Sequence, residues 1–305
     1  MNYYGEEFTR GKIAKMNFRI CLTQISPKIN SAVNYVMAKK KFPHLNKPKT
    51  LDEKLMWLKL YYYANDFSVK KCADKYEVRK YLSQKGYEGL LNELLFVVDR
   101  VEDIPWDTLP AQFAIKWSFG SGFNIICSDK KTFDRDKAIR KLKWWGNIPY
   151  WKMYSEKQYK DIHPRIIGEK FLENKNGGLP VDYKFYCFNG QPKCVMICTE
   201  RETGVPKFYF FDRCWNLLRL NRWGKIAPKD FTVKKPECID KMFDLAEVLS
   251  KPFPFVRLDL YDNDGKIIFG EFTFAPSGGA DPNRLPQTDQ FFGDCLDLSN
   301  IKKNN

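Results

Sequence analysis

The stretch that most constrains the fold of this chain runs from residue 253 to residue 281. It has the sequence pattern of a β-hairpin, and both of its strands carry acidic residues. Residues 256–261 alternate apolar and polar side chains, residues 262–265 read Asp-Asn-Asp-Gly, and residues 268–274 alternate again. Alternation with period two predicts strands, and Asp-Gly between two strands predicts a tight turn. The stretch therefore predicts a β-hairpin with polar faces.

Two acids of this hairpin, Asp259 and Glu271, are candidate metal ligands. Their register depends on the turn, because loops of two and three residues differ by one position and reverse the side chains of one strand. A three-residue loop over residues 263–265 would place Arg257 opposite Glu271, with Asp259 diagonal to Glu271 on the same face. Neighbouring carboxylates repel unless a proton or cation lies between them, and hard oxygen ligands suit Mg²⁺ that holds a nucleotide's phosphates.

An exposed hairpin with a charged outer face is the alternative explanation of this pattern. The residues that follow, Ala-Pro-Ser-Gly-Gly at 275–279, favour the metal pocket. Small residues directly after the second acid let backbone amides approach a bound anion.

The composition is that of a folded protein whose partner is anionic. The chain has 305 residues, of which 44% are hydrophobic, 16% aromatic and 29% charged, with a net charge of +14. Such a charge favours a nucleotide, nucleic acid, acidic glycan or anionic membrane surface without choosing among them. No apolar run reaches the length of a membrane span, and the start lacks a signal-peptide pattern, so we expect a cytoplasmic protein.

The cysteines and histidines argue against a zinc site or a disulfide framework. The nine cysteines show no C-x-x-C spacing, and the two histidines, His44 and His163, are far apart in the sequence. Reduced thiols fit better. We expect the cysteines of strand-like runs, Cys127, Cys187, Cys194 and Cys198, to be small buried hydrophobic residues.

The first part of the chain is basic and helical in pattern. Residues 17–25 and 29–42 favour helices; this region is either a packing arm or a basic surface that contacts membrane or an anionic glycan carrier. Thr50 with Glu53 predicts a capping box that starts the next helix. Residues 69–86 predict a further helix that stops at Gly86, and residues 90–99 lead into a strand.

Residues 112–129 predict two short strands joined by a flexible turn. Lys116 ends the first strand, and Ser118-Phe119-Gly120-Ser121-Gly122 follows it. Backbone N–H groups of such a loop and one ammonium group can bind a triphosphate, although the loop lacks the Walker pattern and an ordinary hairpin turn is the alternative.

Residues 130–165 interleave basic residues with aromatic ones. This pattern is typical of single-stranded nucleic-acid binding, but amphipathic helices explain it better. In that interpretation Trp144, Trp145, Trp151 and Tyr154 lie partly in the core and the lysines are solvated.

The remaining pattern indicates an α+β protein with antiparallel sheets. Residues 182–200 predict two strands around Asn189-Gly190, and residues 238–251 predict a helix just before the acidic hairpin. No regular βαβ repeat is present.

Taken together, these motifs resemble the ATP-grasp superfamily. Within it, the chain is similar to the TupA-like ATP-grasp family of teichuronopeptide and capsule biosynthesis, over residues from about 30 to 298. The segments that carry the resemblance are KPKTLDEKLMWLKLY, DKYEVRKY, KWSFGSGFNIIC, PRIIGEKFLE, DYKFYCFNG, FPFVRLDLY and GEFTFAPSGG.

The resemblance implies an ATP-grasp fold, in which two α+β subdomains grip the nucleotide behind a helical N-terminal region. The implied division is a basic helical region (1–60), a segment before the ATP-grasp part (61–110), a subdomain with the Gly-rich loop (111–172) and a subdomain with the metal-binding hairpin (173–305).

The resemblance also implies roles for residues of the first half. Lys75 and Lys116 match phosphate-binding lysines, and Gly120, Ser121 and Gly122 match the mobile loop over the phosphates. The hinge that holds adenine, largely by backbone groups, matches Glu169, Lys170 and Leu172.

In the second half, Asp182 matches the acid that binds the ribose, and Lys184 is a further phosphate ligand. Asp259 and Glu271 match Mg²⁺ ligands, and Arg257 matches the arginine that steadies developing negative charge. Thr273 stands where most of the superfamily has an asparagine ligand, and a hydroxyl is a weaker ligand for a second Mg²⁺. Ser277, Gly278, Gly279 and Arg201 are expected near the acceptor substrate.

The implied activity is ATP-dependent ligation of a carboxylate to an amine through an acyl phosphate, with ATP and Mg²⁺ as cofactors and Lys116 and Arg257 as catalytic residues. The expected product is an amide on a cell-surface polysaccharide or its precursor, for example between a uronic acid and an amine. Peripheral contact with the inner membrane is a further expectation. A kinase or glycosyltransferase of the same pathway and a nucleic-acid-binding protein are the alternatives.

Overall fold

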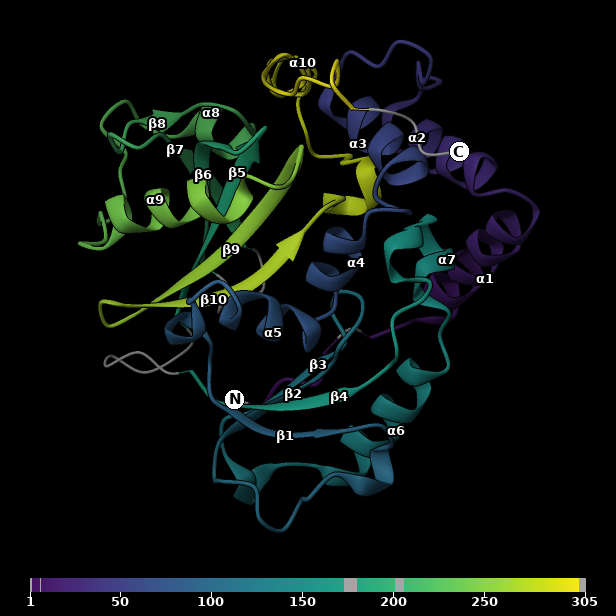
Figure 1. Cartoon of the computed structure of the whole chain (residues 1–305), viewed down its shortest axis with the longest axis vertical. Helices are drawn as coiled ribbons and strands as arrows, with labels where there is room; N and C mark the ends of the chain where they lie inside the picture. Colours follow the sequence, from purple (N-terminus) through teal and green to yellow (C-terminus); the bar gives the residue numbers. More distant parts are fainter. Residues whose placement is uncertain (1, 6, 173–179, 201–205, 302–305) are drawn as a thin grey trace. The chain divides into compact units, whose positions relative to one another are not determined.

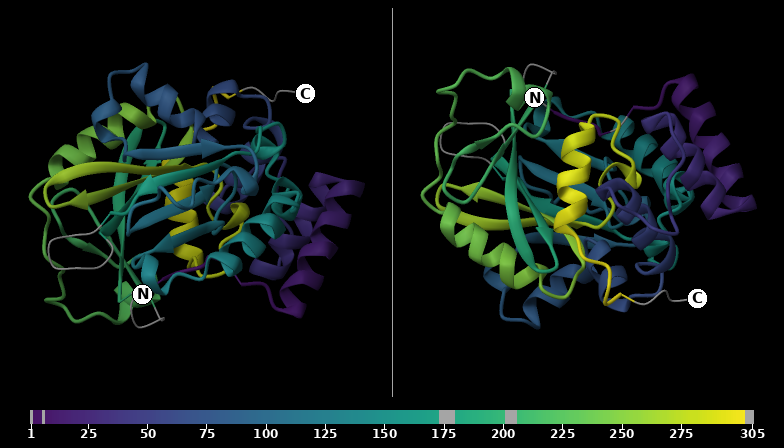
Figure 2. Two further views of the ribbon diagram at one scale, coloured as in Figure 1. Left: turned by 90° about the horizontal axis from the view of Figure 1, so that it is seen from below. Right: turned by 90° about the horizontal axis from the view of Figure 1, so that it is seen from above.

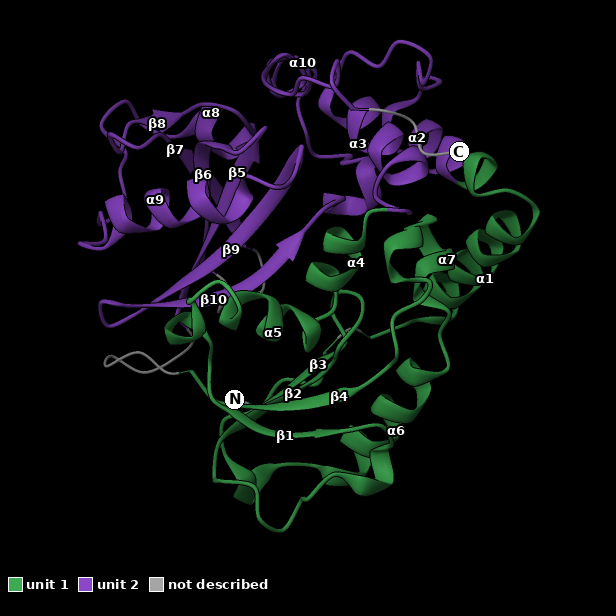
Figure 3. Cartoon of the chain, in the orientation of Figure 1, with its two compact units in different colours: residues 1–30, 66–172 green, residues 31–65, 173–305 purple. Residues whose placement is uncertain are grey.

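The computed structural model describes residues 2–5, 7–172, 180–200 and 206–301 of the chain. Two compact units make up the chain (Figure 3): unit 1 comprises residues 1–30 and 66–172, and unit 2 comprises residues 31–65 and 173–305. The chain therefore passes between the units three times, and each unit is described by itself.

Unit 1 combines a four-stranded antiparallel sheet of order β1-β4-β2-β3 with helices (Figure 1). Its elements are α1 (Arg10–Ile25), α4 (Phe67–Ala73), α5 (Glu77–Ser83), β1 (Leu94–Val98), β2 (Phe113–Trp117), β3 (Asn124–Cys127), α6 (Arg135–Gly146), α7 (Tyr150–Tyr154) and β4 (Ile166–Lys170), and α2 (Pro27–Lys39) continues from it into unit 2.

Unit 2 is built on a six-stranded antiparallel sheet of order β10-β9-β5-β6-β7-β8. Its elements are α3 (Leu51–Tyr61), β5 (Val181–Phe188), β6 (Gln191–Thr199), β7 (Lys207–Phe211), β8 (Leu217–Leu218), α8 (Arg222–Ile226), α9 (Ile239–Ser250), β9 (Phe255–Asn263), β10 (Lys266–Thr273), the 3₁₀ turn η6 (Pro276–Gly279) and α10 (Pro286–Cys295).

One face of the unit 1 sheet packs against α6 and forms part of the hydrophobic core of the unit. Ile115 and Trp117 of β2 are buried with Leu142 and Trp145 of α6, and the Trp117 indole N–H donates to the Leu142 carbonyl at 3.0 Å. Because side chains alternate along a strand, Lys116 lies on the opposite face of β2. The core thus determines which face carries the lysine.

The two faces of the unit 2 sheet are covered by different helices, one by α9 and the other by α10 (Figure 2). Phe185 of β5 meets Phe243 of α9 edge to face, while Tyr186 of β5 stacks on Phe292 of α10. Asp182 and Lys184 share the face of Tyr186, because residues two apart in a strand point the same way. The polar end of that face belongs to the candidate site.

The strands and turn of the acidic hairpin are confirmed, and the structure decides the register that the sequence left dependent on the loop: the three-residue loop is not formed. Asn263 pairs with Lys266, so the loop has two residues, and Glu271 pairs with Asp259 instead of Arg257. A bulge between Phe269 and Glu271 shifts the register by one position, which places the two acids directly opposite each other.

The helix predicted over residues 69–86 is wrong in extent, because the chain forms α4 and α5 with a break between them. The Asp74 carboxylate accepts from the backbone N–H of Tyr76 at 2.7 Å and of Glu77 at 3.2 Å. At the break, the Lys75 N–H donates to the Ser118 carbonyl at 2.8 Å. A side-chain cap and a distant loop therefore divide the helix.

Other predictions about local structure are confirmed. The Thr50 and Glu53 capping box is complete at the start of α3. Asn189 and Gly190, both with positive φ, form the turn between β5 and β6. Trp145 is fully buried and stacked on Phe123, as expected for amphipathic helices and not for a nucleic-acid platform.

The predicted burial of four cysteines is confirmed as well. All nine cysteines are free thiols, and Cys127, Cys187, Cys194 and Cys198 are buried. Within the part of the chain that the structure describes, none of the helices is long and apolar enough to cross a membrane.

Candidate active site

The polar face of the unit 1 sheet carries a charged cluster, the unit 1 cluster, formed by Lys116, Glu169 and Arg79. The Lys116 ammonium lies 2.7 Å from Glu169 Oε2, and Arg79 Nη1 lies 3.2 Å from Glu169 Oε1. Lys116 of β2 and Glu169 of β4 meet because the two strands pair and both side chains leave the same face. The same carboxylate is thus shared by two cations from different elements.

Glu169 stays ionised despite its burial. Burial alone would raise the pKa of this carboxyl, but the charges of Lys116, Arg79 and Lys75 outweigh burial and lower the pKa below its ordinary value. Around this single carboxylate the cations are in excess, which suits a bound anion.

Arg79 was not predicted as a functional residue. It lies on α5, and its other nitrogen, Nη2, donates to the Asn92 carbonyl at 2.6 Å. The sequence signal that could have found it is Asp74 followed by Glu77, a helix-start pattern that begins α5 and so directs Arg79 toward the sheet.

The Gly-rich loop between β2 and β3 lies beside Lys75. The Lys75 ammonium donates to the Gly120 carbonyl, and Gly120 and Gly122 both have positive φ. A side chain on Gly120 would lie 2.7 Å from the Tyr150 ring, so only glycine fits there. The structure thus brings together Lys75 and the loop residues that the sequence indicated separately.

The expected adenine hinge follows β4. The backbone N–H of Lys170 donates to the Glu93 carbonyl at 3.0 Å, and its own carbonyl accepts from the Asn92 side chain at 2.7 Å. These groups are therefore engaged within unit 1. Leu172 is half-buried and is the last described residue before the gap at 173–179.

The unit 2 polar face is a second charged group, carried by β5, β9 and β10. Its members are Asp182, Lys184, Arg257, Asp259, Glu271 and Thr273. Lys184 pairs with Asp259 across β5 and β9, and Glu271 pairs with Asp259 across β10 and β9. Three adjacent strands therefore bring their charged side chains to one place.

Asp259 is the centre of this face. Arg257 holds it with two hydrogen bonds, Nε to Oδ1 at 2.7 Å and Nη2 to Oδ2 at 2.8 Å, and the Lys184 ammonium lies 2.5 Å from Oδ2. Burial would raise the pKa of Asp259, but Arg257 and Lys184 lower it. The carboxylate is therefore ionised and held in one orientation.

Glu271 is the accessible acid of the pair. Its side chain is 32% exposed, whereas that of Asp259 is 3% exposed. The Thr273 hydroxyl lies 3.3 Å from Glu271 Oε1 and 3.0 Å from Arg257 Nη2. Glu271 and Thr273 thus offer oxygen atoms at the edge of the cluster.

Gly270 makes this arrangement sterically feasible. A Cβ atom at this position would lie 2.9 Å from the Asp259 carbonyl oxygen and 3.0 Å from the Tyr261 ring. The bulge that places Glu271 opposite Asp259 brings the two strands too close for a side chain there.

The donor set fits Mg²⁺ that also binds phosphate oxygens. Carboxylate and hydroxyl oxygens are the ligands that Mg²⁺ prefers, and it usually keeps water or phosphate in its other positions. Among the residues that the structure describes, no group of three or more His, Cys, Asp or Glu is placed to hold a metal. The described residues thus provide a pair of carboxylates without a complete set of protein ligands around a metal.

The small-residue turn η6 is fixed within unit 2. Ser277, Gly278 and Gly279 all have positive φ, and the buried Lys59 of α3 donates to the Gly278 carbonyl at 2.7 Å. Lys59 is a further residue that the sequence analysis did not single out, because a lysine in an apolar helix is ordinarily solvent-facing.

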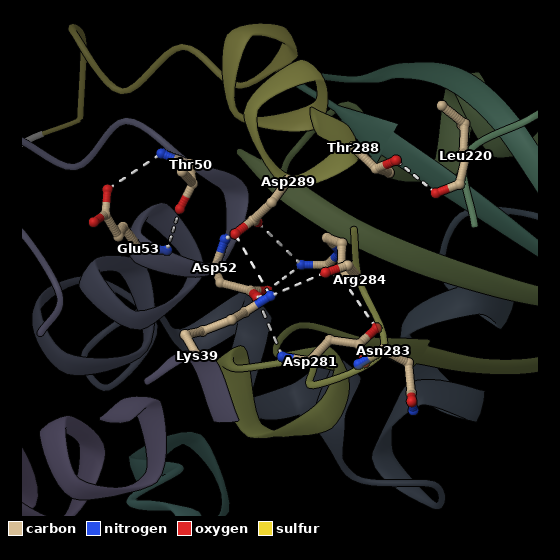
Figure 4. Close-up of polar contacts among 10 residues, drawn as sticks. All are labelled: Lys39, Thr50, Asp52, Glu53, Leu220, Asp281, Asn283, Arg284, Thr288 and Asp289. Carbon is tan, nitrogen blue, oxygen red and sulfur yellow. Dashed lines mark hydrogen bonds and ion pairs between the residues drawn. The ribbon is translucent and has the colours of Figure 1, made fainter. Parts of the chain in front are cut away.

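A buried ion cluster holds the segment after η6 (Figure 4). The carboxylate of Asp52 lies between Lys39, at 2.6 Å, and Arg284, and it accepts from the Asp281 N–H at 3.2 Å. Asp289 accepts from the Asp52 N–H at 2.9 Å. Helices α2, α3 and α10 therefore set the path of the chain that leaves the turn. Arg201, the remaining predicted substrate residue, lies outside the described residues.

The sequence matches one family model. Residues 53–297 match the family described as TupA-like ATPgrasp. No curated protein matches the sequence.

The fold is also similar to solved structures at low identity. A D-alanine–D-alanine ligase from Bacillus anthracis is 14% identical, with 74% of this chain and 68% of that chain covered and a TM-score of 0.41. The ligase from Helicobacter pylori is 12% identical, with coverages of 81% and 67% and a TM-score of 0.41. The ATP-grasp ligase PsnB, complexed with a precursor variant, Mg and ADP, is 11% identical, with coverages of 73% and 57% and a TM-score of 0.41. Likenesses of this size say nothing about activity or substrate.

Proposed function

Because this chain belongs to the TupA-like ATP-grasp family, we propose that it joins a carboxylate to an amine with ATP and so forms an amide on a cell-surface polysaccharide or its precursor. Membership in the family confirms the expected α+β ATP-grasp fold and identifies the chain as an ATP-grasp ligase.

The unit 1 cluster and the Gly-rich loop are proposed to bind the phosphates of ATP. Lys116 and Lys75 provide ammonium groups, and residues 120–122 provide backbone N–H groups. The excess of cations around Glu169 supports this role, because negatively charged phosphate oxygens would balance the positive charge of these side chains. The hinge of Glu169, Lys170 and Leu172 is proposed to hold adenine, with Leu172 as the backbone contact, because the N–H and carbonyl of Lys170 are already hydrogen-bonded.

The unit 2 polar face is proposed to bind Mg²⁺ with the nucleotide. Asp259 and Glu271 would be the carboxylate ligands and Thr273 a weaker one, while Asp182 would bind the ribose and Lys184 a phosphate. A Mg²⁺ ion held there would shield the charge of the transferred phosphoryl group.

The residues of the chain account for a reaction in two steps. A carboxylate oxygen of the substrate attacks the γ-phosphorus, the bond to ADP breaks, and an acyl phosphate forms. The amine then attacks the acyl carbon, phosphate leaves, and the amine loses a proton. Arg257 and Lys116 stabilise the negative charge that develops on phosphoryl oxygens, so no covalent enzyme intermediate is required.

The single observation that carries the proposal is the Arg257–Asp259–Lys184 network with Glu271 directly opposite Asp259. A fixed guanidinium next to two facing carboxylates provides both a site for a divalent cation and a group that stabilises an anion. An exposed, merely solvated hairpin would not bury Asp259 or hold it by two cations.

The proposed acceptor is an anionic sugar such as a uronic acid. The net charge of +14 favours an anionic substrate. Ser277, Gly278 and Gly279 would approach it with backbone groups, Arg201 is a candidate anion ligand, and peripheral contact with the inner membrane would bring the enzyme to a surface precursor.

The test is incubation of the purified chain with Mg·ATP, a uronic-acid oligosaccharide and a panel of amino acids and amines. Release of ADP and phosphate that requires both acceptors, with an amide in the product by mass spectrometry, is expected. ADP release that needs no amine and leaves phosphate on the sugar would indicate a kinase. Consumption of a sugar nucleotide without ATP would indicate a glycosyltransferase, and either result would contradict the proposal.

A further inference from the structure

Helix α1 has two apolar faces, of which only one is used inside unit 1. Ile13, Met16 and Ile20 pack into the core cluster of the unit. On the opposite side, Phe18 is 53% exposed and Ile25 is 73% exposed. A helix of a globular protein ordinarily has one apolar stripe, so the second one is unexplained by folding.

The exposed stripe, which we call the outer face of α1, is continuous. It consists of Ala14, Phe18, Cys21 and Ile25, all exposed and spaced three or four residues apart. Residues at this spacing lie on one side of a helix. Ile29, in the first turn of α2, extends the apolar surface beyond the end of α1.

Helix α1 lies beside α7 (Figure 1), and buried polar contacts with the end of α7 fix its position. The Thr23 hydroxyl donates to the Lys152 carbonyl at 2.7 Å and lies 2.8 Å from the Ser155 hydroxyl. The Asn30 side chain donates to Thr23 at 2.7 Å and to Ser155 at 3.1 Å. Because these groups are satisfied and buried, α1 does not rotate to hide its outer face.

The charged residues around the outer face of α1 indicate which kind of partner can bind it. Residues 8–51 contain no acidic residue, and α1 has none in its first turn. Arg10, Lys12, Lys15 and Lys28 are exposed around the apolar stripe. A protein partner would need both an apolar groove and an acidic rim, whereas an anionic lipid layer offers a negative surface directly over an apolar interior.

We propose that the outer face of α1 binds an anionic lipid bilayer, with Phe18 and Ile25 inserted at the acyl boundary and the basic side chains at the headgroups. The helix lies in the plane of the interface, since no described helix can span a membrane. This inference deepens the membrane contact in the proposed function. The test measures vesicle binding and no catalytic activity, so the membrane inference and the proposed ligase function can fail separately.

The experiment is co-sedimentation of the full chain with vesicles of phosphatidylcholine containing about one third phosphatidylglycerol, and with vesicles of phosphatidylcholine alone. Binding is expected only with the anionic vesicles and is expected to weaken as salt rises. The double variant Phe18→Ser with Ile25→Ser is expected to bind at least about tenfold more weakly. Ile226→Ser is the matched control, because Ile226 is also 73% exposed but lies in unit 2, and it should bind like the wild type.

Charge is tested by Lys12→Gln with Lys15→Gln, which should weaken binding about tenfold and flatten its salt dependence. Circular dichroism and the Tm show that each variant is folded. Equal binding to neutral vesicles, no binding to anionic ones, or loss of binding in the Ile226→Ser control would overturn the proposal. A dimer in solution that Phe18→Ser dissociates would identify a second copy as the occupant and also overturn it.

Discussion

The unit 1 cluster and the unit 2 polar face are both buried ion networks on antiparallel sheets, but their balance of charge is opposite. In unit 1 a single carboxylate, Glu169, is shared by Lys116 and Arg79. In unit 2 the carboxylates outnumber the cations: they belong to Asp182, Asp259 and Glu271, and the cations are Lys184 and Arg257.

The difference in charge supports a different proposed ligand for each network. A surplus of cations is relieved by an anion, and the unit 1 cluster adjoins the Gly-rich loop through Lys75. A surplus of carboxylates is relieved by a cation, and Glu271 is the acid that remains accessible. This difference in charge is the reason we propose phosphates as the ligand of the unit 1 cluster and Mg²⁺ as the ligand of the unit 2 polar face.

The largest effect is expected from removing the accessible carboxylate of unit 2. Glu271→Gln keeps the size of the side chain, so the hairpin should fold and some ATP binding should remain. Turnover should fall about 100-fold or more, because the proposed Mg²⁺ would stabilise the transferring phosphoryl group by several kcal/mol. Steady-state release of ADP measures it.

Glu237→Gln, at an exposed carboxyl of unit 2, is the control and should be as active as the wild type. If a folded Glu271→Gln enzyme turned over ATP normally, the acidic hairpin would be structural. The assignment of Mg²⁺ to the unit 2 polar face would then be wrong. Thr273→Asn, which provides a stronger ligand, should keep activity or tighten the dependence on Mg²⁺.

An intermediate effect is expected from removing a cation of unit 1. Lys116→Met deletes a charge-assisted hydrogen bond, worth about 1.5–3 kcal/mol, to phosphate, which corresponds to roughly 10- to 100-fold in affinity for ATP. Isothermal titration with a non-hydrolysable ATP analogue measures the change. Lys131→Met, at an exposed lysine of the same unit, should bind ATP normally.

Unchanged affinity in Lys116→Met would refute the phosphate assignment of the unit 1 cluster. The Tm should also fall, because Glu169 is left buried with one fewer partner.

The smallest effect concerns acid stability, in which the two networks should behave alike. The cations lower the pKa values of Glu169 and Asp259 below their ordinary values of 4.5 and 3.8. A carboxyl group whose pKa is lower in the folded than in the unfolded protein stabilises the fold at pH values above its unfolded pKa. This stabilisation is lost as the pH falls through the folded pKa.

Wild-type Tm should therefore drop steeply below about pH 4.5, and Glu169→Gln and Asp259→Asn should each show a shallower drop there, although they are less stable at pH 7. Thermal melts between pH 3 and 7 measure this, with Glu237→Gln as the control. A slope identical to that of the wild type in either variant would show that the carboxylate in question is not held by its cations.

Much of the local structure could be predicted from the sequence because it depends on neighbouring residues. The capping box of Thr50 and Glu53, the turn at Asn189-Gly190 and the strands on both sides of the Gly-rich loop are short-range patterns. The burial of Trp145 followed from helical spacing. The alternation of Arg257 and Asp259 with apolar residues placed both on one face.

Other features depended on contacts between distant segments. The break between α4 and α5 involves a hydrogen bond from Lys75 to Ser118, and the role of Arg79 depends on that break. The helical periodicity of residues 69–86 does not reveal the break, because Ser118 lies in another segment; only the local pattern of Asp74 and Glu77 points to it.

The sequence by itself determined the residue types of the candidate site: two carboxylates, an arginine and lysines spaced along strands, together with a glycine-rich loop. Only the tertiary structure decided which of them face each other. Gly270 permits a bulge that moves Glu271 opposite Asp259, and Lys184 joins them from β5. Register across a sheet is set by the packing of both faces and by close backbone approach, which are properties of the folded chain and not of any one segment.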